Sequence, residues 1–133
     1  KRDSSEINHY NLSDRNSQIQ DIMINEGSSH RIDLTKRNIK VEDNVVIINV
    51  SCRRTNIQST LIKSYWLCGY VMYQNNLFYP EIQVILSVQK KEIETLVTIA
   101  KGKDVIKLSQ LKLSEYSSYS NFLDKLEVYR KQD

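Results

Sequence analysis

Hydrophobic and polar residues recur with two different periods along this chain, and the period changes several times. Ile19, Ile22 and Met23 have the spacing of one helical face and predict a first helix over 14–26. The preceding residues 1–12 are polar and aperiodic, so we expect a flexible lead-in there.

The period then shortens to two. Residues 31–35 and 39–41 alternate between apolar and polar side chains, as half-buried strands do. Asp43 and Asn44 form a turn signal before the segment 45–52, which is β-branched on both faces. This composition predicts a central strand of the sheet.

A long helix is predicted over 57–76. Two apolar stripes cover more than half of its surface, so it should be buried on most sides. Gly69 lies in its middle and costs about 1 kcal/mol relative to alanine. We therefore expect another backbone to pack closely against Gly69.

Alternation returns after Pro80, where 82–88 predicts a strand. A second strand is predicted over 93–99, with Glu94 and Thr98 facing outward. Its inward residues are expected to be Ile93, Val97 and Ile99.

The last third of the chain predicts a hairpin and a helix. Residues 101–104 (Lys-Gly-Lys-Asp) form a hairpin signal, and 105–108 then predicts a third strand. The segment 114–120 is expected to be a connector. A final helix is predicted over 118–131, with Tyr119, Phe122, Leu123 and Leu126 facing inward.

This order predicts a single α+β domain over 13–133: helix, strands, helix, strands, helix. Consecutive strands require hairpins, so we expect a largely antiparallel sheet of four to six strands. The sheet should pack on the central apolar helix at 57–76.

Aromatic residues are concentrated in one segment, because six of the eleven fall within residues 65–79. Core packing is the simplest interpretation. The alternative is that Tyr70, Tyr73, Phe78 and Tyr79 are partly exposed and line a ligand pocket or a protein interface.

Charge is unevenly distributed around a net charge of +3. The segment 31–63 has seven basic and three acidic residues. It contains the best candidate patch for an anionic partner, but a hairpin over 31–41 could place these residues at opposite strand ends. The candidate patch is formed by Arg31, Lys36, Arg37, Lys40, Arg53 and Arg54.

The residues that carry catalysis or bind cofactors do not form a recognisable pattern. His9, His30, Cys52 and Cys68 are too scattered for a zinc site, which needs three or four ligands. Three glycines without a phosphate-binding spacing argue against common nucleotide sites. We therefore expect no catalytic residues, metal or cofactor, although an irregular enzyme site is not excluded.

The favoured function is a non-enzymatic binding or interaction domain with a protein partner, either self or other. Such a domain could be the soluble part of a larger or membrane-anchored assembly. The alternative is a small nucleic-acid or acidic-partner binder using residues 31–54. No stretch is apolar enough to span a membrane. The first residue is not Met, so we expect either a processed chain or a cut boundary. The compartment stays open between the cytoplasm and the exterior of a membrane-anchored precursor.

Overall fold

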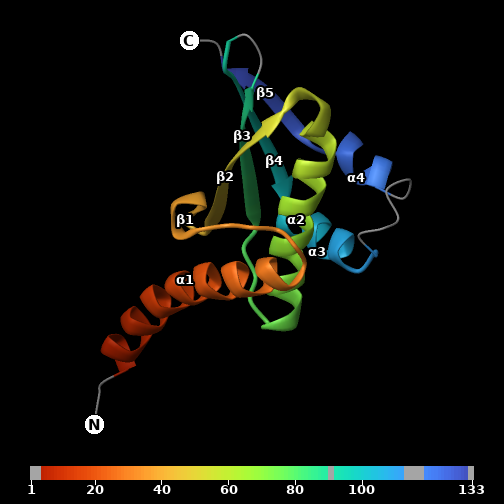
Figure 1. The fold of residues 1–133 in the computed structure, drawn as a ribbon. Coiled ribbons are helices and arrows are strands. Elements are labelled where there is room, and N and C mark those ends of the chain that lie inside the picture. The colour runs from red at the N-terminus through yellow and green to blue at the C-terminus, as the bar shows by residue number, and fades with distance from the viewer. Residues whose placement is uncertain (1–3, 90–91, 113–118, 132–133) are drawn as a thin grey trace.

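The computed structural model describes residues 4–89, 92–112 and 119–131. It shows one α+β domain, as predicted, with a five-stranded sheet in the order β1-β2-β3-β4-β5. The helices α2, α3 and α4 lie on one side of this sheet (Figure 1). The strands are β1 (Ile39–Glu42), β2 (Val45–Arg53), β3 (Glu81–Gln89), β4 (Glu94–Lys101) and β5 (Glu127–Lys131).

The sheet is largely antiparallel, as predicted, but it is mixed because one of its inner pairs is parallel. Strands β2 and β3 are parallel, whereas the β1–β2, β3–β4 and β4–β5 pairs are antiparallel. The helix α2 (Ile57–Gln74) connects β2 to β3 along the inner face of the sheet. It returns the chain to the end at which β2 began, so β3 must run in the same direction as β2.

The β1–β2 hairpin confirms the predicted turn. Asp43 and Asn44 both adopt positive φ, at 48° and 66°, as a two-residue hairpin requires. The strand expected over 31–35 is wrong, because that segment has no regular structure. Its alternation is nevertheless real, since Ile32 and Leu34 are buried against the core.

The first helix, α1 (Ser4–Ser29), is longer than the predicted 14–26 and includes most of the expected lead-in. It ends in a Schellman motif, in which Arg31 has a φ of 59°. The Ile32 N–H donates to the Gly27 carbonyl at 2.7 Å. A Cβ at position 27 would overlap the Ile32 carbonyl, so this turn requires glycine there.

The helix α2 forms the centre of the core, as its pattern predicts. Ten of its residues are buried, including Tyr65, Leu67 and Met72. Its inner neighbours on the sheet are the alternating residues Val84 and Leu86 of β3, which are fully buried together with two further side chains of that strand. The helix therefore fills the space between the sheet and the other helices.

The hairpin over 101–104 and the strand over 105–108 are wrong, because β4 continues to Lys101 and is followed directly by α3 (Gly102–Ser109). Val105 and Leu108 have helical spacing and are buried against α2. A Cβ at position 69 would overlap the Val105 carbonyl. Gly69 thus allows α3 to approach α2, which is the close backbone contact that the sequence predicts.

The final helix over 118–131 is also wrong in part. The structure has a short α4 (Ser120–Asp124) followed by β5, which pairs with β4. Tyr119 and Phe122 are buried as expected, and Leu123 and Leu126 pack against the core. The segment after Leu126 is a strand because its backbone completes the hydrogen bonding of β4. The connector expected over 114–120 lies mostly outside the described residues.

The predicted inward and outward faces of β4 are reversed. Leu96, Thr98 and Ala100 face the core, whereas Val97 and Ile99 lie on the outer face. Thr98 is only 1% exposed, and its hydroxyl group has two hydrogen-bond partners. It donates to the Val84 carbonyl at 2.9 Å and lies 2.7 Å from the Tyr65 hydroxyl. A satisfied polar group can be buried at little cost.

The Gly69 contact predicts the sign of a substitution. Gly69→Ala should lower the free energy of unfolding by about 2 kcal/mol, because the added methyl group displaces α3. Helix propensity alone predicts the opposite sign, a stabilisation of about 1 kcal/mol. Urea unfolding measures the difference, with the exposed Gln58→Ala as a control that should change stability by less than about 0.5 kcal/mol. A Gly69→Ala protein more stable than the wild type would contradict the packing.

Candidate functional site

The outer face of the sheet is the most distinctive exposed surface. No helix covers it in the parts of the chain that the structure describes (Figure 1). The pairing places Ile85, Val97 and Tyr129 side by side on β3, β4 and β5. Ile99 follows Val97 along β4, and Ile47 lies on β2 one row away. We call these five residues the apolar patch.

The apolar patch is accessible to solvent and is bordered by polar side chains. Tyr129 is 54% exposed, and the other four residues are half-buried by their strand neighbours. Gln83 lies within the patch, between Ile47 and Ile99. Polar residues border the patch on the same face: Lys40, Asn49, Glu81, Ser87, Thr95, Lys101 and Glu127. An apolar centre with a polar rim is the usual organisation of a protein interface.

Sequence reasoning missed the apolar patch for two reasons. Val97 and Ile99 were assigned to the core because the faces of β4 were reversed, and Tyr129 was assigned to a helix. One signal was available: Ile85 interrupts the alternation of β3 with an apolar residue on the polar side. An apolar residue at such a position indicates an outer face that is not wholly polar.

The four aromatic candidates do not form one site. Tyr73 and Phe78 are exposed, at 59% and 60%, whereas Tyr79 is buried. Tyr70 is half-buried and stacks on Trp66, with ring centroids 5.0 Å apart. The segment therefore serves mainly as core, and its two exposed rings lie around the C-terminal end of α2.

Half-buried His30 is a packing residue between α1 and α2. Its ring makes edge contacts with Trp66 at 5.0 Å and Tyr70 at 5.2 Å. Its Nδ1 atom donates to the Glu26 carbonyl at 2.9 Å. The Trp66 indole donates to the Leu111 carbonyl at 2.8 Å. These contacts explain the histidine without a catalytic role.

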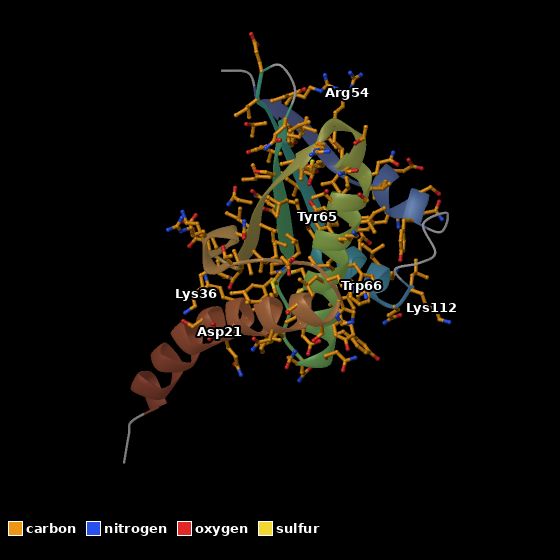
Figure 2. All side chains as sticks on the ribbon, in the orientation of Figure 1. Asp21, Lys36, Arg54, Tyr65, Trp66 and Lys112 are labelled. Atoms are coloured by element: carbon orange, nitrogen blue, oxygen red, sulfur yellow. The ribbon has the colours of Figure 1, made fainter. Side chains whose placement is uncertain are left out.

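The six basic candidates do not converge. Figure 2 shows Lys36 beside Asp21 of α1, whereas Arg54 lies at the other end of β2. The Lys36 ammonium is 3.9 Å from the Asp21 carboxylate, and Lys40 forms an ion pair with Glu42 at 2.8 Å. Arg37 follows Lys36 in the chain, Arg53 precedes Arg54, and Arg31 lies just after the end of α1. The six residues therefore do not form the single expected patch.

A hollow of about 440 Å³ opens where β3 begins and β4 ends. Its charged side chains come from β3, β4, α3, the residue that follows α4, and the start of β5. Three are basic and three acidic, so the hollow has no net preference for anions or cations. They are Glu81, Lys101, Lys103, Asp104, Lys125 and Glu127.

The two cysteines are free thiols in different environments. Cys68 is fully buried in α2, and burial raises its pKa from 9.0 to about 12. Cys52 is half-buried at the end of β2. Burial raises its pKa, and a hydrogen bond with Thr60 lowers it. A raised pKa makes a thiol a weaker nucleophile at neutral pH, so neither environment activates a cysteine.

Within the described ranges, His, Cys, Asp and Glu side chains form no group of three that could hold a metal ion. In the same part of the chain, no helix has both the length and the apolar character needed to cross a membrane. Comparison with protein-family models, curated proteins and solved structures found no match. The proposals below therefore rest on the geometry of this chain.

The thiol environments predict different reactivities. In the native protein, Cys52 should react with a thiol reagent, whereas Cys68 should react only as fast as the protein unfolds. The raised pKa of Cys68 also makes the free energy of unfolding depend on pH. Its contribution to stability is present below about pH 9 and is lost as the pH rises from about 9 towards 12. The stability difference between the wild type and Cys68→Ala should therefore shrink over that interval. Equal labelling of both thiols in the native state would contradict this assignment.

Proposed function

We propose that this chain is a non-enzymatic interaction domain that binds another protein through the outer face of its sheet. The apolar patch is the observation that carries this proposal. Ile85, Val97 and Tyr129 form a continuous row across three strands with no covering helix among the described residues. Apolar groups in such a row gain free energy when a partner removes them from water, by roughly 25 cal/mol per Å².

The arrangement of the rest of the molecule supports a rigid binding platform. Strands β2, β3 and β4 are backed on their inner face by the buried helix α2. Their outer side chains are therefore held in fixed positions before a partner arrives. A preorganised surface loses less conformational entropy on binding than a flexible loop does.

The nucleic-acid alternative gains no support from the geometry. A duplex binder needs basic side chains along one continuous face. Here Lys36 and Arg54 lie at opposite ends of the sheet, and Lys40 is already paired with Glu42. The border of the apolar patch is mixed in charge, because Lys40 and Lys101 lie there together with Glu81 and Glu127.

Site-specific photo-crosslinking in the native cell tests the proposal. A photoreactive phenylalanine replaces Ile85 in the apolar patch or, as the control, Gln58, which is exposed on α2. We expect protein adducts from position 85 that are absent from position 58. The second variant Val97→Lys should abolish these adducts while changing the free energy of unfolding by less than about 1 kcal/mol.

Three outcomes would contradict the proposal. Position 85 could give no protein adduct, or it could give the same adducts as position 58. An adduct that persists in a folded Val97→Lys protein would also show that the patch does not bind the partner. Salt-dependent binding to duplex DNA or RNA, without protein adducts, would favour the nucleic-acid alternative instead.

A further inference from the structure

The free edge of β5 is the second unusual surface. This strand is the last in the sheet, so one side of its backbone has no strand neighbour among the described residues. Its two central side chains are exposed apolar groups on opposite faces, Val128 at 55% and Tyr129 at 54%. Sheet edges are usually protected against pairing by short length, charge, proline or cover. Charged residues flank the centre of β5 on both sides, but Val128 and Tyr129 themselves are uncharged.

The sequence of β5 is complementary to itself when read in opposite directions. Glu127 begins the strand, Tyr129 is its middle residue, and the strand ends with Arg130 and Lys131. In an antiparallel pair of two copies centred on Tyr129, position 127 of one copy lies opposite position 131 of the other. An acidic residue then faces a basic one twice, and Val128 faces Arg130 twice. The two Tyr129 residues face each other on the two-fold axis.

We propose that two copies of this chain pair through the antiparallel edges of β5. The pairing joins two five-stranded sheets into one and places the two apolar patches on the same continuous outer face. It also gives the exposed backbone groups of β5 hydrogen-bond partners. Opposite charges and aromatic residues directly across a strand pair each contribute favourably to pairing. The surface that pairs is the edge of β5, which is distinct from the outer face of the sheet proposed to bind another protein.

The opposite edge of the sheet does not share these properties. Strand β1 has only four residues, Ile39–Glu42. Its two apolar side chains are not exposed. Lys40 and Glu42 pair with each other at 2.8 Å within one copy, as Arg130 of β5 does with Glu94 at 3.4 Å. The Glu127 carboxylate also has a partner within the chain, because it accepts a hydrogen bond from the Tyr129 hydroxyl at 3.0 Å. Both of these residues are exposed and can exchange that contact for one across the axis.

Sedimentation equilibrium over a range of protein concentrations tests the pairing. The five-residue interface is small, so we expect a concentration-dependent dimer. Glu127→Lys or Lys131→Glu alone places like charges opposite each other and should weaken dimerisation about tenfold. The double swap Glu127→Lys/Lys131→Glu should restore it. Lys36→Glu makes the same charge change as Lys131→Glu far from β5 and should have no effect.

A disulfide test fixes the register independently of charge. In a Cys52→Ser background, Tyr129→Cys should form a dimer disulfide on mild oxidation, because facing residues in antiparallel strands have Cα atoms about 4.5–5.5 Å apart. Val128→Cys is the matched control, since its counterpart on the other copy lies two positions away, and it should oxidise much more slowly.

Three results would overturn the pairing: a monomer at all concentrations, a dimer that ignores every charge swap, or equal oxidation at positions 128 and 129. None of them affects the outer-face crosslinks from position 85. Conversely, a β5 dimer without those crosslinks would contradict only the proposed binding face. The two proposals are therefore separable.

Discussion

The hydrogen bonds of Thr98 determine which face of β4 meets the core. The Thr98 hydroxyl bonds to the Val84 carbonyl of β3 and to the Tyr65 hydroxyl of α2, and all three groups are buried. Burial raises the pKa of Tyr65 and keeps its hydroxyl protonated. With Thr98 inside, Val97 and Ile99 must lie outside, since successive side chains of a strand point to opposite faces. This polar contact therefore accounts for the two residues that β4 contributes to the apolar patch.

The helix α2 connects this contact to the rest of the fold. Tyr65 fixes the face of β4, Gly69 admits α3, and Trp66 packs against His30 at the end of α1. Leu67 also lies close to Gly27 of α1. The helix further dictates the parallel pairing of β2 and β3, because it carries the chain back along the sheet. The remaining elements take positions that α2 leaves available.

The sequence predicted what local pattern can determine. The helix around Tyr65, the strands β2 and β3, and the turn at Asp43 each have a strong signal over a few residues, and all were found. The predictions failed where contacts between residues distant in the sequence determine the structure. Thr98 appears to face solvent until Tyr65, 33 positions away, is placed beside it. Val105 fits a strand or a helix equally well until Gly69 is seen to admit a helix.

The candidate site was less predictable than the fold for the same reason. Apart from Ile85, the residues of the apolar patch are ordinary in sequence, and only the pairing of β3, β4 and β5 brings Ile85, Val97 and Tyr129 together. The basic candidates show the opposite relation between sequence and structure. Lys36 and Arg54 are close in sequence, but the length of β2 separates them. Composition indicated a basic binding surface, but the fold separates the residues that would form it. Composition gave little indication of the apolar patch, which the strand pairing assembles.

A double-mutant cycle on Tyr65 and Thr98 tests this account most directly. Tyr65→Phe, Thr98→Val and the double variant are compared with the wild type by urea unfolding. If the two hydroxyls bond in the core, Thr98→Val leaves the Tyr65 hydroxyl unpaired and costs about 1–2 kcal/mol. The coupling energy should then be about 1 kcal/mol. Effects that add to within about 0.3 kcal/mol, with Thr98→Val neutral or stabilising, would contradict a buried bond between the two hydroxyls and the inward orientation of Thr98.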